Sequence, residues 1–393
     1  MPPFADELNQ RLADLRKQGL YRELRRVDSA PGPRIQIDGK TLLSFSSNDY
    51  LGFANHPVLK AAAINAVEKF GAGTGASRLI CGSLAPFHKL EESLATFKKT
   101  EAALTFSTGY AAALGAITSL VGKDDVVILD KLVHACIVDA AKLSGAKMRV
   151  FRHNDLNDLE DKLKWARENI QSPGKALIVT ESIFSMDGDA APLKEIVALK
   201  EQYGAWLMVD EAHATGVIGH SGRGLADKLG VSSQIEVQMG TLGKAIGASG
   251  GFICGSRALV DYLVNRARSF IFSTAPVPAA AAAATAGIGL VHSAEGEERR
   301  QQLHARGAEL RQAIGDTPPA AFSAVIPLII GDTSKAVDAA ARLREQNIFV
   351  PAIRYPTVAR NSARLRITLT AAHSSDDVAT LMRALETIIN RQS

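Results

Sequence analysis

The sequence predicts an α/β fold in which helices cover a mostly parallel sheet, followed by a smaller α+β domain at the C-terminus. Between residues 102 and 254, short and almost wholly apolar runs alternate with helical segments. Such runs are typical of parallel strands that are buried on both faces. Beyond residue 290 the pattern changes to charged helices and a few short strands, which indicates a second structural unit.

Length and composition indicate more than one domain. The chain has 393 residues, of which 46% are hydrophobic and 22% charged, so it can bury a large core. We predict an N-terminal arm of helix and hairpin over residues 1–45, a large domain over 46–290 and a small α+β domain over 291–393.

Charge and cysteine usage exclude several classes of protein. Lys and Arg total 45 against 41 Asp and Glu, without a basic stripe, so we expect no nucleic-acid partner. The N-terminus lacks the apolar segment of a signal peptide, and the stretch from Ala275 to Val291 is shorter than the ~20 residues of a membrane span. Cys81, Cys136 and Cys254 have neither metal nor redox spacing. We therefore expect a cytoplasmic protein with no membrane partner and no metal site.

The elements follow in order along the chain. Phe4, Leu8, Leu12 and Leu15 have helical spacing, and residues 35–40 alternate before an Asp-Gly turn, which predicts the helix and hairpin of the arm. In the large domain we expect strands at 102–106, 126–130, 148–151, 176–181, 206–209, 235–239 and 252–254, and helices at 90–97, 156–169, 193–203 and 275–291. In the small domain we expect helices at 295–314, 335–346 and 378–389, strands at 325–330, 348–353 and 365–369, and a break at Pro318-Pro319.

A single lysine, Lys244, lies in the glycine-rich stretch from Gly240 to Gly247, between two apolar runs. A lysine on such an uncrowded backbone can bond covalently to a carbonyl group as a Schiff base. The competing interpretation is a surface lysine in a hairpin. Upstream, Asp210 and His213 follow the apolar run that begins at Trp206, and open α/β sheets place ligand contacts at that end of a strand. A carboxylate, a histidine and a Schiff-base lysine are the groups that pyridoxal phosphate (PLP) requires.

Taken alone, each further candidate residue is weaker evidence for a ligand-binding site. Ser107-Thr108-Gly109-Tyr110 joins a strand to a helix, an arrangement that binds anions through free N–H groups. His134 follows a strand and is either a ligand contact or a core histidine. Arg366 lies in an alternating strand and is either an inward clamp for a carboxylate or a surface arginine. The stretch from Phe45 to Gly52 fits a loop that lines a pocket or a simple turn.

Four motifs together resemble the α-oxoamine synthase family of PLP enzymes, which have the fold type I aminotransferase-like architecture. They are Ser47–Gly52, Ser107–Tyr110, Val209–His213 and Thr241–Lys244, and the resemblance extends from Leu12 to Leu385. It implies four catalytic residues, namely Lys244, Asp210, His134 and His213. It implies cofactor contacts by Gly109, Tyr110, His134, Ser185, Asp210, His213, Thr241, Lys244 and, from a neighbouring subunit, Thr274. It implies substrate contacts by Arg22, Asn48, Ser77, His134, Thr357 and Arg366.

Two segments resemble the family members of the biotin pathway, namely Cys81–His88 and Ile353–Arg366. This resemblance implies a decarboxylative condensation of L-alanine with pimeloyl-CoA or a pimeloyl-carrier protein, by a homodimer. The chain departs from the pattern at Tyr355, where proline is usual, and over residues 359–362, which lack the usual proline and glycine. Since that loop is implied to contact the acyl chain, the departures concern acyl preference.

Three alternatives remain open at this point. The chain could be another synthase of the family, such as a 2-amino-3-ketobutyrate CoA ligase that uses glycine and acetyl-CoA. It could be an aminotransferase, which shares the lysine but does not carry out the condensation. It could be a non-catalytic partner subunit, although such subunits lose the lysine, and this chain retains both Lys244 and Asp210.

Overall fold

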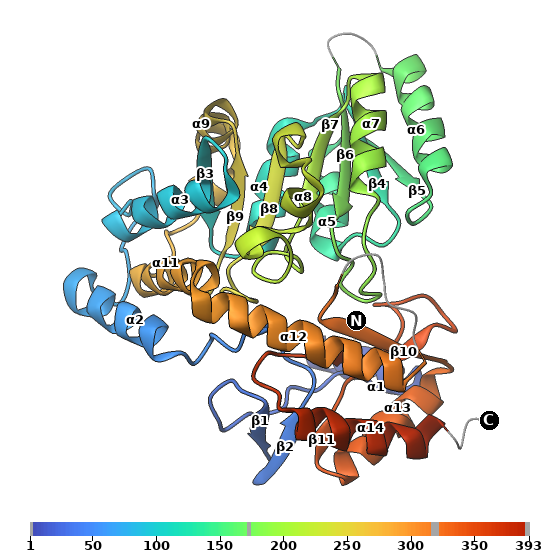
Figure 1. Ribbon diagram of the computed structural model, residues 1–393. Helices are drawn as coiled ribbons and strands as arrows, with labels where there is room; N and C mark the ends of the chain where they lie inside the picture. The colour runs from blue at the N-terminus through green and yellow to red at the C-terminus, as the bar shows by residue number, and fades with distance from the viewer. Residues whose placement is uncertain (1–2, 171–173, 316–321, 390–393) are drawn as a thin grey trace.

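The computed structural model describes residues 3–170, 174–315 and 322–389, so Pro318-Pro319 lies outside the described residues. A seven-stranded sheet has the order β3-β9-β8-β7-β6-β4-β5 (Figure 1). Its strands are β3 (Ala102–Phe106), β4 (Val126–Asp130), β5 (Lys147–Phe151), β6 (Ala176–Glu181), β7 (Trp206–Asp210), β8 (Val237–Thr241) and β9 (Gly251–Gly255). Within this sheet β9 is antiparallel to both its neighbours, and the other pairs are parallel. The predicted mostly parallel α/β fold is confirmed.

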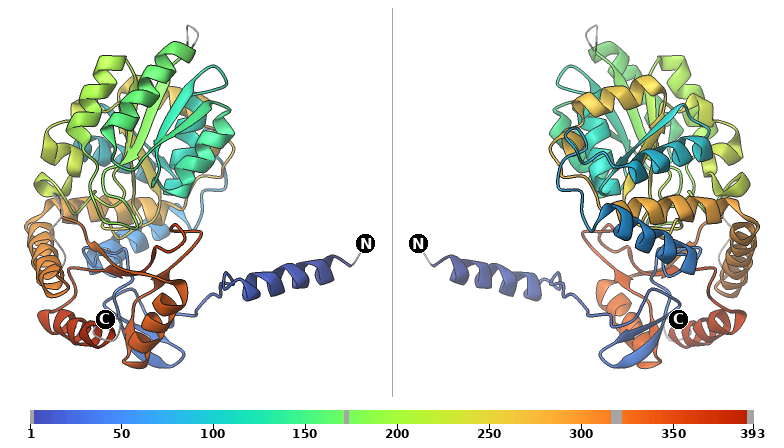
Figure 2. Two further views of the ribbon diagram at one scale, coloured as in Figure 1. Left: turned by 90° about the vertical axis from the view of Figure 1, so that its right-hand side faces the viewer. Right: turned by 90° about the vertical axis from the view of Figure 1, so that its left-hand side faces the viewer.

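Helices lie on both sides of this sheet (Figure 2). They are α4 (Gly109–Leu120), α5 (Ala135–Ser144), α6 (Leu156–Asn169), α7 (Leu193–Tyr203), α8 (Leu225–Leu229), α9 (Arg257–Arg266) and α10 (Arg268–Ile271), with single 3-10 turns at His220–Gly222 and Ser232–Gln234. Every residue of β3, β4 and β9 is buried, which explains why these strands are apolar without alternation. Gly240 is required in β8, since a Cβ there would lie 2.4 Å from the Phe252 ring.

Three further helices pack together beside the sheet, and one of them, α3, contacts β3 and β9. Helix α11 (Pro278–His292) packs against α2 (Pro57–Phe70) and α3 (Ala85–Lys98). The predicted alanine-rich helix is therefore interior on one face, where Ala281, Ala284 and Ile288 are buried. Among the described residues, no helix combines the length and apolar character needed to cross a bilayer.

The N-terminal arm contains an isolated helix and a hairpin. Helix α1 (Phe4–Lys17) buries none of its residues and projects from the body of the molecule (Figure 2). Strands β1 (Arg34–Ile37) and β2 (Lys40–Ser44) pair around Asp38 and Gly39, which both have positive φ as this tight turn requires. Strand β2 also pairs, in parallel, with β11 (Ile348–Phe349), so the hairpin is joined to the C-terminal part of the chain.

The C-terminal part has its own sheet, in the order β10-β13-β12, formed by β10 (Val325–Gly331), β12 (Ala352–Ile353) and β13 (Ala363–Thr368). Helices α12 (Ala294–Ala313), α13 (Thr333–Glu345) and α14 (Ser375–Ile389) accompany it. The single strand expected over 348–353 is divided at Val350-Pro351 into β11 and β12, which join different sheets. Proline cannot donate to a strand ladder, which explains the division.

Candidate active site

Polar side chains meet where the parallel strands end. Asp210 closes β7 and Glu181 closes β6, and the two residues are direct register partners. His134 follows β4 and caps the N-terminus of α5, where its Nδ1 accepts from the Cys136 N–H at 3.2 Å. Because these strands are parallel, their carboxyl ends share one edge of the sheet, where α/β folds bind ligands.

Lys244 reaches this edge from the turn between β8 and β9. The turn is closed by two backbone bonds, from Leu242 N–H to the Gly250 carbonyl and from Gly247 N–H to the Lys244 carbonyl, each 2.9 Å long. Gly247 has a φ of 76°, and a Cβ there would lie 2.6 Å from the backbone of Phe53. The lysine of the glycine-rich stretch is therefore held on a tightly packed turn, with its Nζ 2.7 Å from His213 Nε2.

His213 is buried between Lys244 and Tyr50. Its Nδ1 lies 2.6 Å from the Tyr50 hydroxyl, which is also 3.2 Å from Asn48 Oδ1. Burial lowers the pKa of His213 well below its ordinary value, and the positive charge of Lys244 lowers it further. Burial raises the pKa of Tyr50 to about 12. Both rings are therefore uncharged at neutral pH and act as hydrogen-bonding groups.

The amine of Lys244 and the carboxyl of Asp210 are electrostatically coupled. Burial lowers the pKa of Lys244, while the negative charges of Asp210 and Glu181 raise it. Burial raises the pKa of Asp210, and the charge of Lys244 acts in the opposite direction. Asp210 Oδ1 also accepts the Ala212 N–H at 2.9 Å, which orients the carboxylate. Burial thus makes the nucleophilic neutral form of Lys244 accessible at lower pH than for an exposed lysine, while its charged form stabilises the carboxylate of Asp210.

Glu181 is a residue of this site that the sequence analysis missed. It is almost completely buried, and its Oε1 accepts the backbone N–H of His134 at 2.5 Å. Its pKa is raised well above the ordinary value by burial and then by the charge of Asp210. Glu181 ends an apolar strand just as Asp210 does, so the same sequence signal could have identified it.

The turn before α4 has the features of an anion-binding cradle. Thr108 caps the helix by accepting the Ala111 N–H at 3.0 Å, and the first N–H groups of a helix have no acceptor within it. A Cβ on Gly109 would lie 3.7 Å from the side chain of Thr241 in β8, so this glycine and the threonine adjoin. Tyr110 is 46% exposed and donates to Asp139 at 2.7 Å.

The loop from Ser182 to Ala190 carries Ser185 and is held on two sides. On the side of the seven-stranded sheet, His153 lies 2.9 Å from Asp130 and 2.7 Å from Asp189. These carboxylates raise the pKa of His153 to about 10, against the opposing effect of burial. On the other side, Arg366 Nε donates to the Ser185 carbonyl at 2.8 Å.

Arg366 is buried in β13, so the inward orientation is the correct one of the two that the sequence left open. Its guanidinium also donates to Asn48 Oδ1 at 3.3 Å and to the Thr368 hydroxyl at 2.9 Å. Asn48 in turn contacts Tyr50, which contacts His213, so a continuous polar network links Arg366 with Lys244. Arg364 pairs instead with Asp187 at 2.5 Å.

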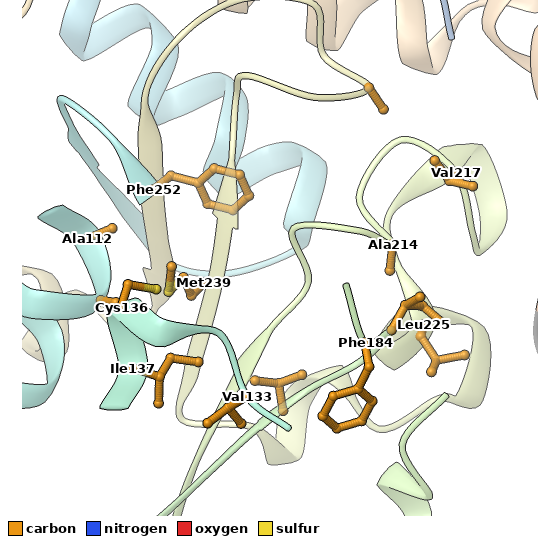
Figure 3. Packing of buried hydrophobic residues seen from close by; sticks show 14 of the residues in the cluster. Ala112, Val133, Cys136, Ile137, Phe184, Ala214, Val217, Leu225, Met239 and Phe252 are labelled. Atoms are coloured by element: carbon orange, nitrogen blue, oxygen red, sulfur yellow. The ribbon is translucent and has the colours of Figure 1, made fainter. Parts of the chain in front are cut away.

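Buried apolar side chains, among them Val133, Phe184 and Met239, pack in the core next to residues of the site (Figure 3). Val133 and Phe184 immediately precede His134 and Ser185 in the sequence, and both are buried. Met239 belongs to the same buried cluster. The loops that carry the polar side chains are therefore anchored in the core.

The remaining predicted residues form two separate pairs. Ser77 and Thr274 face each other in an antiparallel bridge, and Arg22 lies 3.5 Å from the Thr357 hydroxyl. Among the described residues, no hydrogen bond connects either pair with Lys244. Their roles therefore stay a prediction.

The sequence matches the family described as "Aminotransferase class I and II" over residues 40–385. The chain belongs to the class I and II aminotransferase family. Among its relatives, the 8-amino-7-oxononanoate synthase of Geobacter sulfurreducens is 48% identical over 98% of this chain and 97% of its own length. That of Thermoanaerobacter pseudethanolicus is 43% identical over 98% and 96%.

Solved structures of this family superpose over most of the chain. A serine palmitoyltransferase from S. paucimobilis with a bound PLP–myriocin aldimine has a TM-score of 0.91 at 30% identity, over 98% of both chains. An 8-amino-7-oxononanoate synthase from Francisella tularensis has a TM-score of 0.75 at 29% identity, over 89% of this chain and 97% of its own. The predicted fold type I architecture agrees with both.

Proposed function

We propose that this protein is an 8-amino-7-oxononanoate synthase. It would condense L-alanine with a pimeloyl thioester, release carbon dioxide and the thiol carrier, and serve biotin synthesis in the cytoplasm. The observation that carries this proposal is the 43–48% identity, over almost the whole chain, to relatives of that name. The side chains at the carboxyl ends of the parallel strands are chemically suited to this reaction.

The residues at the strand edge fit PLP. When bound, PLP supplies a protonated pyridine ring that accepts electrons from the α-carbon of an amino acid. Lys244 offers a half-buried amine for the aldehyde, and Asp210 is a buried acid suited to the ring nitrogen. The cradle of Thr108, Gly109 and Thr241 suits the phosphate.

Lys244, His213 and Arg366 would each have a separate role in the reaction. Lys244, with its lowered pKa, would take the α-proton of the bound alanine as a free amine. The uncharged His213 beside it, fixed by Tyr50, would hold that amine in place. Arg366 would bind the alanine carboxylate, since it is a buried guanidinium without a carboxylate partner among the described ion pairs.

A homodimer is part of the proposal. The Ser77–Thr274 bridge adjoins an exposed apolar group that comprises Leu79, Ile80, Phe272 and Val277. Contiguous exposed apolar surface indicates an interaction site. We propose that a second copy covers this surface, and the family resemblance implies that Thr274 then contacts the partner's phosphate.

The structural similarity to serine palmitoyltransferase favours, as a second candidate, a synthase that uses serine and a long-chain acyl thioester. Release of coenzyme A separates the candidates when it is measured with alanine and pimeloyl-CoA, serine and palmitoyl-CoA, or glycine and acetyl-CoA. We expect turnover to be fastest by far with the first pair. Preference for another pair would reject the proposed substrates.

A further inference from the structure

Glu181 lies between three residues that the family resemblance implies are in contact with the cofactor. It ends β6, whose neighbours in the sheet are β7, which ends in Asp210, and β4, which leads into His134. The loop that carries Ser185 begins directly after Glu181. Because adjacent strands lie about 4.8 Å apart, a side chain at this position can reach the segments on both sides of its strand.

The carboxylate of Glu181 is bonded to backbone groups of two of these residues. Its Oε1 accepts the His134 N–H at 2.5 Å, and the backbone N–H of Ser185 is a second donor to it. Glu181 is 2% exposed, and among the described residues no ion pair joins it to a cation. Because hydrogen bonds to a charged acceptor are stronger than neutral ones, this buried carboxylate fixes the backbone at both positions.

The other described hydrogen bonds of His134 and Ser185 do not join the two residues to each other. His134 caps α5 through the Cys136 N–H, which orients its ring within its own segment. Ser185 is held through its carbonyl by Arg366 in β13. Among the described hydrogen bonds, Glu181 is therefore the group that receives a donor from both residues. An apolar side chain in its place would leave two buried N–H groups without an acceptor.

We propose that Glu181 is a positioning residue, which sets the distance between the His134 ring and the Ser185 hydroxyl so that the flat ring of PLP fits against both. The inference rests on the proposed function and adds a residue to its site. Glu181 acts through the backbone of its two partners and has no direct part in the reaction. A ligand contact that is held through a rigid backbone needs no reordering when the ligand binds, which favours affinity.

A carboxylate that accepts a backbone N–H can also have a purely structural role, and Glu236 is such a case. It accepts the Leu207 N–H at 2.8 Å near the start of β7 and is ion-paired with Lys200. Asp210 ends the same strand, so Glu236 lies at the end of β7 that is remote from the proposed cofactor site. It provides the matched control, because the contact is the same and the location differs.

The test measures Kd for PLP by titrating cofactor-free protein. Glu181→Gln keeps one carbonyl oxygen and so one of the two backbone bonds, whereas Glu181→Leu has a similar size and keeps neither. We expect Kd to rise about tenfold in Glu181→Gln and about a hundredfold or more in Glu181→Leu, since each hydrogen bond to a charged group contributes about a factor of ten or more. The kcat of the folded protein with alanine and pimeloyl-CoA should fall in the same order. Glu236→Leu should lower the melting temperature and leave Kd for PLP unchanged.

Amide hydrogen exchange of cofactor-free protein, followed by mass spectrometry, gives a readout independent of catalysis. Peptides that contain His134 and Ser185 should both exchange faster in Glu181→Leu, and neither should in Glu236→Leu.

The proposal is wrong if Glu181→Gln binds PLP as tightly as the parent, if Glu181→Leu binds it no more weakly than Glu181→Gln, or if Glu236→Leu loses as much affinity. Should Glu181→Leu not fold, Glu181→Gln decides alone. Failure of the proposed function would look different, because the parent protein itself would then release no coenzyme A from pimeloyl-CoA with alanine.

Discussion

Lys98, which is buried, and Lys244, which is half-buried, interact electrostatically with the consecutive carboxylates Glu211 and Asp210 at the end of β7, and they are used in opposite ways. Lys98 is ion-paired with Glu211 and also donates to the Arg223 carbonyl at 2.5 Å. Lys244 faces Asp210, but its described hydrogen bond goes to a neutral ring nitrogen of His213. A lysine whose charge is matched by a carboxylate stabilises the fold, whereas one with a lowered pKa offers a free amine.

The histidines of the same edge repeat this contrast. His153 lies between two carboxylates, which raise its pKa to about 10 against the effect of burial, so it is a cation at neutral pH and holds a loop. His213 lies between a phenol and an amine, and its pKa is lowered. In both comparisons, the side chain that is proposed to take part in the reaction is the one that has no ion pair with a carboxylate.

The largest effect is expected from Lys244→Ala. It removes the amine that the proposed function requires, so turnover with alanine and pimeloyl-CoA should fall about 10³-fold or more. Lys228→Ala, an exposed lysine on α8, is the matched control and should retain full activity. Near-normal rates in the Lys244 variant, with an unchanged melting temperature in both proteins, would show that Lys244 and Lys98 do not differ as argued.

Lys98→Met should act on stability instead. It leaves the fully buried carboxylate of Glu211 unpaired, which typically costs about 3–5 kcal/mol of unfolding free energy. Chemical denaturation would measure this loss, and the folded fraction should keep its kcat. Lys99→Met changes the exposed neighbouring lysine and provides the control. A loss of kcat without a loss of stability would contradict the structural role of Lys98.

The pH at which Lys244 reacts sharpens the comparison further. Burial places the pKa of this lysine below the ordinary 10.5, and Asp210 opposes that shift. The rate at which cofactor-free protein takes up PLP should therefore reach half its maximum below pH 10.5. In Asp210→Asn the midpoint should fall further, because a charge that favours the ammonium form is removed. A midpoint that rises in Asp210→Asn, or shifts equally in Asp227→Asn, would contradict the coupling.

The smallest effect is expected from His153→Gln. The folded pKa of His153, about 10, lies above the ordinary 6.5, so its contribution to stability is complete below pH 6.5 and is lost as pH rises through 10. The difference in unfolding free energy between parent and variant should therefore be greatest near pH 6 and vanish above pH 10. Urea titrations at several pH values measure it, with the exposed His292→Gln as control. A difference in unfolding free energy that grows with pH would contradict the assignment of His153 as a stabilising cation.

The sequence predicts the main sheet well because most of its strands, though not β5, are continuous apolar runs. For the same reason it locates Asp210, His213 and Lys244, which follow such runs. It does not predict that β2 pairs with β11, because residues 43 and 348 are brought together only by tertiary packing. The sequence also does not predict that the strand expected over residues 348–353 is divided at Pro351, because the division depends on which sheet each half joins.

Contacts between distant loops likewise leave no local sequence pattern. Two hydrogen bonds depend on segments that meet only after folding. One joins the Tyr50 hydroxyl and His213, and the other runs from Arg354 to the Gly19 carbonyl in the N-terminal arm. Glu181 is different, since its place at a strand end was visible in the sequence. A carboxylate at a strand end does not by itself reveal its partner, which here is the backbone N–H of His134.

Borohydride trapping tests the central contrast most directly. The protein would be incubated with PLP, reduced and digested, and the modified peptide would be identified by mass spectrometry. We predict a stable pyridoxyl group on Lys244 and none on Lys98, since only the former offers a free amine. Modification of a different lysine, or no modification of folded protein, would contradict the account.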